Sequence, residues 1–266
     1  RLIHLLEERS ASSLRQLTLT GSADSLTEVI NALCESKTLT KHLESLSLYL
    51  DIDDKQLSQL MTCADLSNLR QLTIYSEAIT SNSFTALSSA EFARNLTTLN
   101  LSFTKIGSRG WKQLGTIPFS SLESLNLQGT GGGNAGAEAL SRSDYLTRLQ
   151  TLNISRNQIG PDGITAICGS EILTELKSLN ICNNPLGSAG ARAIAFSNRT
   201  SALRHLWINQ IGNSGTSALA SSPSLQNLES LTIGFLEDNS TGEACVALAE
   251  SGILAGLKEL SVTGGV

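Results

Sequence analysis

The chain has 266 residues, of which 40% are hydrophobic, 16% are charged and 4% are aromatic, and its formal net charge is −5. Affinity for phosphates needs a surplus of Lys and Arg, so this composition excludes a basic nucleic-acid-binding protein, and the ample apolar content excludes a disordered chain. No stretch approaches the roughly 20 apolar residues that a membrane helix requires, so we expect no membrane span.

Residues 1–13 precede any regular motif. Their apolar run from Leu2 to Leu6 predicts the helix of a preceding repeat or of an N-terminal cap. From residue 14 to residue 266 the chain follows one pattern, and we expect a single domain over that range.

The pattern is a hexapeptide, Leu-x-x-Leu-x-(Leu/Ile/Val), that recurs ten times. It begins at Leu14, Leu43, Leu69, Leu96, Leu122, Leu149, Leu176, Leu203, Leu228 and Leu257. The mean spacing is (257 − 14)/9 = 27 residues. Even spacing of this kind is typical of repeat architectures, in which each unit buries its apolar face only by stacking on its neighbours.

Each unit is predicted to contain a short strand, a turn, a helix and a loop. In the unit that starts at Leu176, the inward side chains of Leu179 and Ile181 alternate with polar residues, as in a half-buried strand. The turn-forming segment 183–187 then leads into a helix. Because a crossover helix connects each strand to the next, we expect the strands to be parallel.

These ten units resemble the leucine-rich repeat family over residues 14–262. The 27-residue unit and the helix signature of segment 186–194, Leu-Gly-Ser-Ala-Gly-Ala-Arg-Ala-Ile, are similar to the ribonuclease-inhibitor-like subclass, in the short form common in bacterial proteins. The resemblance implies an α/β fold, a right-handed β-α solenoid shaped like a horseshoe, with a parallel sheet on the concave face and helices on the convex face. It implies no catalytic residue. Solenoid ends need covering, so we expect further domains or a partner beyond this chain.

The cysteines are expected to be free. Their positions are Cys34, Cys63, Cys168, Cys182 and Cys245. An odd count without close pairs argues against a disulfide framework and favours small apolar side chains in a reducing compartment. Cys34 and Cys63 hold equivalent places, each 20 residues after the first Leu of its unit. Stacked helices lie too far apart for an easy bridge, so we expect free thiols there as well.

Two segments resemble ligand-binding motifs but are better explained by the repeat. Segment 131–136 matches Gly-x-Gly-x-x-Gly between a strand and a helix, yet Gly136 falls where other units also place glycine, and the acidic residue of a dinucleotide site is missing. Segment 51–54, Asp-Ile-Asp-Asp, lacks the later Gly and Glu of a calcium loop. We expect turns and a helix N-terminus there, no metal, no cofactor and no catalytic constellation.

Four asparagines form a regular column on the strands. Asn100, Asn126, Asn153 and Asn180 hold the same outward position in four successive units. Parallel strands in register set them about 4.8 Å apart on the concave face. Such amides can bond one another or the backbone of a partner. Alternatively, Leu-Asn-Leu/Ile is only a common form of this repeat.

The aromatic residues divide into a buried set and an outward set. Phe92, Phe119 and Tyr145 each lie 23 residues after the first Leu of their unit, which predicts a buried spine. The outward set lies on or just beyond the strands and consists of Tyr49, Tyr75, Phe103, Trp207 and Phe235. His205 precedes Trp207 on the same face. Exposed Trp and Tyr are frequent interface hot spots, so this set supplies candidate contact residues; the alternative for each is a lone surface aromatic.

The outward strand residues are mostly Ser, Thr, Asn and Gln. A protein or peptide held by hydrogen bonds and a few aromatic anchors fits such a face better than a highly basic ligand or nucleic acid. We therefore predict a non-enzymatic binding module for a protein or peptide, in the cytoplasm or secreted. The alternatives are the targeting arm of a bacterial effector acting on proteins in a host cytoplasm and, by fold analogy alone, a GTPase regulator like Ran GTPase-activating proteins.

Overall fold

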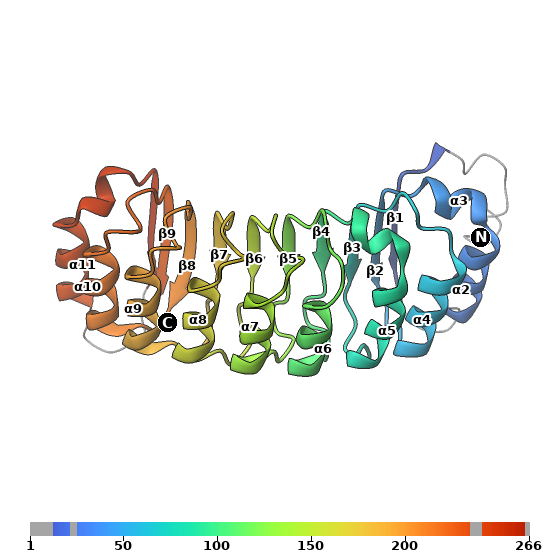
Figure 1. Cartoon of the computed structure of the whole chain (residues 1–266), viewed down its shortest axis with the longest axis horizontal. Helices are drawn as coiled ribbons and strands as arrows, with labels where there is room; N and C mark the ends of the chain where they lie inside the picture. Colours follow the sequence, from blue (N-terminus) through green and yellow to red (C-terminus); the bar gives the residue numbers. More distant parts are fainter. Residues whose placement is uncertain (1–12, 22–25, 235–240, 264–266) are drawn as a thin grey trace.

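The computed structural model describes residues 13–21, 26–234 and 241–263 and shows one curved solenoid (Figure 1). The candidate contact residue Phe235 lies outside the described residues. So does the helix expected within residues 1–13, of which the structure describes Ser13 alone.

In the part of the chain that the structure describes, ten parallel strands form one sheet in the order of the chain. They are β1 (Gln16–Thr20), β2 (Ser45–Tyr49), β3 (Gln71–Ile74), β4 (Thr98–Asn100), β5 (Ser124–Asn126), β6 (Thr151–Asn153), β7 (Ser178–Asn180), β8 (His205–Asn209), β9 (Ser230–Gly234) and β10 (Glu259–Thr263). Every strand begins two residues after the first Leu of its unit. The predicted register is confirmed, because equivalent residues of neighbouring strands pair directly.

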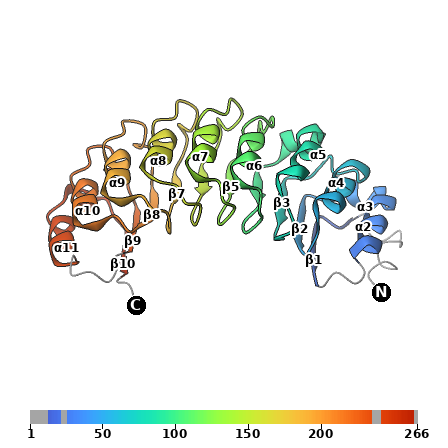
Figure 2. The ribbon, with the colours of Figure 1, turned by 90° about the horizontal axis from the view of Figure 1, so that it is seen from below.

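Helices connect the strands along the outer curve of the arc, and the strands line its inner curve (Figure 2). The α-helices are α2 (Leu26–Glu35), α3 (Lys37–His42), α4 (Asp54–Cys63), α5 (Phe84–Ser89), α6 (Gly107–Leu114), α7 (Gly133–Ser141), α8 (Pro161–Cys168), α9 (Gly187–Ala195), α10 (Gly212–Ala220) and α11 (Thr241–Ala249). The described residues also include the 3-10 helices η3 (Ser81–Ser83), η4 (Glu91–Asn95) and η5 (Gly252–Ala255). The predicted α/β solenoid, with its sheet concave and its helices convex, is confirmed.

The core runs between the sheet and the helices. The inward strand residues Leu72, Leu125 and Leu179 are at most 1% exposed, and most leucines that open the units, such as Leu96, are buried as well, whereas Leu14 of the first unit is 37% exposed. Each such side chain contributes about 2 kcal/mol of apolar burial. On β10, an edge strand of the described sheet, the inward residues Leu260 and Val262 are each 41% exposed.

The predicted buried spine holds for two of its three aromatic residues. Phe92 and Phe119 are buried, but Tyr145 is 41% exposed, so the prediction for Tyr145 is wrong. Phe92 and Tyr145 both lie four residues before the next unit's first Leu. In the unit of Tyr145 the next residue, Leu146, fills the buried position, whereas the 3-10 helix η4 buries both Phe92 and the small Ala93.

Serine hydroxyls link successive units behind the helices. Each donates to a carbonyl at or near the end of the preceding unit's helix, and the pairs are Ser170 with Ser141, Ser197 with Cys168 and Ser222 with Ala195, at 2.5–2.6 Å. The same hydroxyls accept from backbone N–H groups of their own loops. Otherwise orphaned polar groups are thereby satisfied, and each unit is held in register with its neighbour.

The expectation of free thiols is wrong for one pair. Cys34, near the end of α2, and Cys63, at the end of α4, form a disulfide with a Cα–Cα distance of 5.1 Å. This distance lies within the ordinary range for a bridge. The two helices are direct neighbours, so equivalent positions at their ends approach more closely than typical helix axes do. Cys168 and Cys182 are free. In the described parts of the chain, no helix has the length and apolarity to cross a membrane.

Candidate functional site

The concave face is lined by hydroxyl and amide side chains. The outward residues of the central strands include Thr98 and Ser124 beside the asparagine column, and the strand pairing aligns them unit by unit. Among the outward strand residues that the structure describes, only His205 and Glu259 carry a basic or an acidic side chain. The face therefore offers hydrogen bonds with little formal charge, as predicted from the sequence.

The four asparagines of the column lie side by side, as predicted. Direct pairing joins Asn100 to Asn126, Asn126 to Asn153 and Asn153 to Asn180. In each, the side-chain Oδ1 accepts from the backbone N–H two residues later, at 3.0–3.1 Å. Each amide thus stabilises the turn at the end of its own strand. The column has a structural role, and any role in binding remains a prediction.

Three outward aromatic residues form a ladder across successive units. The ring centroids of Tyr49 and Tyr75 are 6.2 Å apart, and those of Tyr75 and Phe103 are 5.6 Å apart. Tyr49 is 46% exposed and Tyr75 is 44% exposed. The spacing is within the usual range for interacting aromatic rings. Phe103, at φ 61°, holds its ring over Gly129 of the next unit, where a Cβ atom would lie 3.0 Å from it.

His205 and Trp207 form a second aromatic pair on β8. Their rings are stacked, with centroids 6.1 Å apart and planes inclined by 24°. Trp207 pairs with Asn180 on β7 and with Thr232 on β9, so it continues the asparagine column. Both side chains are half-buried, which leaves part of each ring available to a ligand.

A second set of asparagines, buried in the turns, is not among the predicted site residues. Asn157 is fully buried; its Oδ1 accepts from the N–H groups of Thr130 and Gly132, and its Nδ2 donates to the carbonyls of Leu127 and Ser155. Asn184 bonds in the same manner one unit later. Thr104 and Thr130 hold the equivalent place in earlier units. The sequence signal for these buried hydrogen-bonding residues is that they recur at the same position after successive strands.

The glycine-rich segment 131–136 is explained by packing. Trp111 on α6 is fully buried, and its indole lies against Gly132 and Gly136, where added Cβ atoms would come within 2.3 Å and 2.9 Å of it. Gly131 and Gly133 have φ of 77° and 59°, which favours glycine. These residues are glycine because of a neighbouring tryptophan and a tight turn, which accounts for the motif without a nucleotide.

The acidic segment 51–54 forms a helix start and a link between units. Asp53 caps α4 through a reciprocal capping box with Gln56. Asp54 accepts hydrogen bonds from Thr80 and Ser83 of the next unit. Burial raises the pKa of Asp54, but hydrogen bonds from Ser83, Thr80 and Asn82 outweigh it and hold the pKa below its ordinary value. Within the described residues, no three His, Cys, Asp or Glu side chains cluster as a metal site would require.

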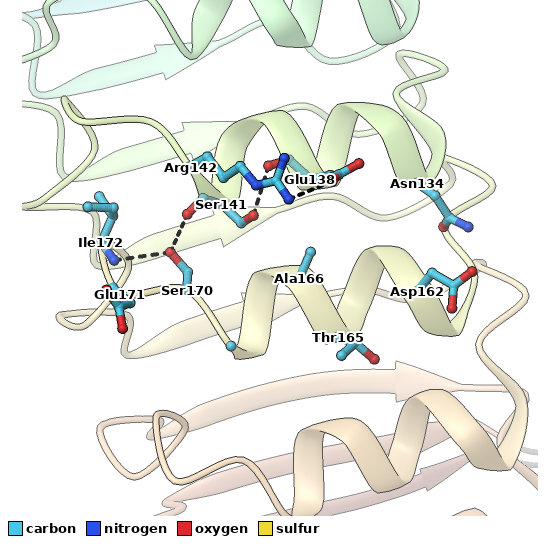
Figure 3. A pocket seen from close by; sticks show the side chains of 11 residues that line it. Asn134, Glu138, Ser141, Arg142, Asp162, Thr165, Ala166, Ser170, Glu171 and Ile172 are labelled. Carbon is cyan, nitrogen blue, oxygen red and sulfur yellow. Dashed lines mark hydrogen bonds and ion pairs between the residues drawn. The ribbon is translucent and has the colours of Figure 1, made fainter.

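A groove of about 660 Å³ opens on the convex side between α7 and α8 (Figure 3). Glu138 and Arg142 on its wall pair at 2.9 Å. Ser170 donates to Ser141 and accepts from the backbone of Ile172. The lining groups named here satisfy one another, so the groove supplies less to a ligand than the concave face, which we take as the candidate site.

The amino edge of the sheet carries the charged residues that adjoin this face. Ion pairs join successive units there: Arg15 with Glu44 at 3.5 Å, Arg204 with Glu229 at 3.8 Å, and Lys258 with Glu229 at 2.7 Å. The hydrogen bond and the charge of Lys258 hold the pKa of Glu229 below its ordinary value. These groups are exposed and lie next to groups of opposite charge, with Glu229 shared between Arg204 and Lys258. Exposed ion pairs of this kind interact weakly, so they give the concave face no strong field.

Comparison with known proteins agrees with this architecture. The family model described as Leucine Rich repeat matches residues 92–114, 145–168 and 173–195. No curated protein matches the sequence closely enough to count as a relative. Leucine-rich repeat folds generally serve as protein-binding modules, and no catalytic family is indicated.

Three solved structures illustrate the similarity, each at 16% sequence identity. The complex of Rad7 and Elc1 in yeast matches with a TM-score of 0.47 over 89% of this chain and 69% of that chain. An internalin from Listeria monocytogenes matches with a TM-score of 0.42 over 99% of this chain and 88% of that chain. A Bacteroides fragilis protein matches with a TM-score of 0.53 over 99% of this chain and 68% of that chain. Only the last of these three scores exceeds 0.5, and at this identity it concerns the fold alone. With three segments matched to the family and the same unit running through ten parallel strands, the chain contains leucine-rich repeats and folds as a leucine-rich repeat solenoid.

Proposed function

We propose that this chain is a non-enzymatic binding module that recognises a protein or peptide on its concave face. The observation that carries the proposal is the combination of a hydrogen-bonding sheet of little formal charge with two partly exposed aromatic groups, the ladder of Tyr49, Tyr75 and Phe103 and the pair of His205 and Trp207. Interfaces are typically held by a few aromatic anchors among many weaker polar contacts.

Affinity capture with the immobilised chain, followed by measurement of Kd for each captured protein, tests the proposal. Trp207→Ala removes a half-buried anchor but leaves the neighbouring core residues Leu206 and Ile208 in place, so we expect binding at least about tenfold weaker with unchanged circular dichroism. Phe196→Ala is the matched control, because Phe196 follows α9 on the convex side and is 56% exposed. A partner that tolerates Trp207→Ala and Tyr75→Ala but not Phe196→Ala would place the site on the helices.

We further assign the units to the ribonuclease-inhibitor-like subclass. The 27-residue spacing and an α-helix in each connection between strands support this assignment. Two broader roles, the targeting arm of a bacterial effector and a GTPase regulator, rest on analogy of fold. Stimulated GTP hydrolysis across a panel of small GTPases tests the regulator.

We infer that the chain matures where disulfides form, as a secreted protein does, rather than in a reducing cytoplasm. The bridge between Cys34 and Cys63 supports this, since structural disulfides are rare in cytosolic proteins. Alkylation of the native protein before and after reduction, followed by mass spectrometry, tests the inference: two thiols should become reactive only after reduction. Alkylation of both cysteines before reduction would favour the cytoplasm.

A further inference from the structure

The hydrogen bonds of the asparagine column fix which atom each amide turns toward the concave space. A backbone N–H can only donate, so the side-chain atom that accepts from it must be the oxygen. This is the case in Asn100, Asn126, Asn153 and Asn180. The remaining group of each amide is the Nδ2 donor. In Asn153 this donor has a long contact of 3.5 Å with Gln128 Oε1.

The column therefore presents a row of Nδ2 donors, while the Oδ1 atom of each amide already accepts from a backbone N–H group. Adjacent asparagines pair across parallel strands, so the donors recur about every 4.8 Å. Hydroxyls of Ser124 and Ser178 lie in the same register beside them. A ligand complementary to this row offers oxygen acceptors and needs no formal charge.

Aromatic groups stand at both ends of the row. Phe103 follows Asn100 on the same unit and contacts Tyr75, and Trp207 pairs with Asn180 at the other end. From β4 to β8 there are four strand intervals, or roughly 19 Å. An extended polypeptide rises about 3.3 Å per residue, so about six residues span the distance.

We propose that the concave face holds an extended segment of a partner polypeptide laid across strands β4 to β8. Those main-chain carbonyls of the segment that face the sheet and meet a donor accept from Nδ2 groups of the asparagine column. Two large apolar or aromatic side chains of the segment, about six residues apart, contact Tyr75 and Phe103 at one end and Trp207 at the other. The inference rests on the proposed function and specifies its partner, since backbone carbonyls bind whatever the intervening sequence and the two anchors select it.

The probe is a displayed library of random linear peptides of about 12 residues, which is longer than the span of about six residues, selected on the immobilised full chain. We expect enriched peptides to carry two large apolar or aromatic residues separated by about five to seven positions. Enrichment of a single anchor, or no enrichment over a blank surface, would overturn the proposal.

Asn126→Asp and Asn180→Asp, alone and combined, test the donor row on the enriched peptides. Aspartate keeps an oxygen that accepts from the backbone N–H and replaces the outward donor by an acceptor. We expect the double variant to fold normally and to bind at least about tenfold more weakly. Asn198→Asp is the control for each single variant, because Asn198 is exposed in the connection from α9 to β8 and the change in charge is the same. Equal affinity of both single variants and the control would overturn the role of the amides.

The two proposals fail in different ways. A folded partner that is lost with Trp207→Ala, in the absence of any enriched peptide, would leave the binding module standing and overturn the extended segment. A partner that is insensitive to every concave substitution would overturn both.

Discussion

Asparagine serves two purposes in this solenoid, and its hydrogen bonds separate them. Asn180 is half-buried on a strand, with its oxygen bonded to the backbone of Cys182 and its amide group turned to the concave space. Four residues later, Asn184 is buried and bonds to backbone groups of two units. The first can contact a ligand without a change in fold, whereas the second is part of the structure itself.

Asn157→Ala should destabilise the fold strongly. The substitution leaves the buried N–H groups of Thr130 and Gly132 without their acceptor, and each unsatisfied group costs about 1–3 kcal/mol. We expect a loss of at least about 2 kcal/mol in the free energy of unfolding, measured by urea denaturation. Asn157→Thr should lose less, because Thr130 holds the equivalent place one unit earlier. Equal losses for Ala and Thr would contradict this account.

Gly132→Ala should destabilise the chain through contact with one side chain. The new Cβ would lie 2.3 Å from the indole of Trp111, which is fully buried and donates its Nε1–H to Thr130 at 2.8 Å. Overpacking of this kind costs about 1–3 kcal/mol. Gly242→Ala is the matched control: the helical Gly242 has no atom within 4 Å of an added Cβ, so the change should be neutral or stabilise by up to about 1 kcal/mol. Thermal unfolding of both variants tests this: the midpoint should fall for Gly132→Ala and should stay unchanged or rise for Gly242→Ala.

At the scale of elements, the strands could be predicted and several details of their connections could not. Every strand follows its leucine by two residues, because the hexapeptide itself forms the strand and its inward positions. The connections contain short elements such as α3 and η4, whose lengths differ between units. Tyr145 was misplaced because Leu146 fills the buried position in its unit, whereas η4 buries both Phe92 and Ala93 in the equivalent segment. The disulfide was missed because its geometry depends on how closely the ends of α2 and α4 approach, which no spacing in one sequence reveals.

Loss of the disulfide between Cys34 and Cys63 should destabilise the first units. The bridge encloses a loop with a sequence separation of 29 residues, for which the loop-entropy estimate is about 3.5 kcal/mol. We expect reduction, or the double change Cys34→Ser and Cys63→Ser, to lower the free energy of unfolding by about this amount and so to lower the urea midpoint. Cys182→Ser removes a free thiol and should leave the midpoint unchanged. A midpoint insensitive to reduction would show that the bridge contributes nothing to stability.

The contact between α4 and the following unit should weaken in acid. Asp54 joins them through Thr80 and Ser83, and its pKa in the fold lies below the ordinary value. A lowered pKa means that the stabilisation is complete above the ordinary value, near 3.9, and disappears as the pH falls through the lowered one. Asp54→Asn should therefore cost about 1 kcal/mol near pH 6, a figure reduced for its solvent exposure. Thermal unfolding of the variant and of the wild type at pH 6 and at pH 2 measures this difference, which should vanish at the lower pH.

At the scale of the molecule, charge and hydrogen-bonding capacity are separated onto different surfaces. The concave strands bear hydroxyls and amides, and the charged residues that precede the strands pair along the amino edge. The sequence predicted the neutral face, since alternate strand positions can be read directly once the register is known. It did not predict which amide atom points outward, because that depends on backbone bonds two residues away. Nor could spacing predict that Phe103 joins Tyr49 and Tyr75 in one ladder, because that depends on the positive φ of Phe103.

This separation predicts that binding depends weakly on salt. A partner that contacts hydroxyls, amides and aromatic rings displaces few counterions, so raising NaCl from about 50 to 500 mM should change its Kd by less than about threefold. A partner bound along the amino edge would lose its contacts to Arg70, Lys177 and Arg204 as screening increases, and its Kd would rise steeply. The variant Lys177→Gln then distinguishes the two surfaces: Lys177 is exposed and contacts Gln150 at 3.1 Å, so its loss should weaken only edge binding. A steep salt dependence together with sensitivity to Lys177→Gln would move the site from the concave face to that edge, because screening acts on charges and leaves stacking and neutral hydrogen bonds nearly unchanged.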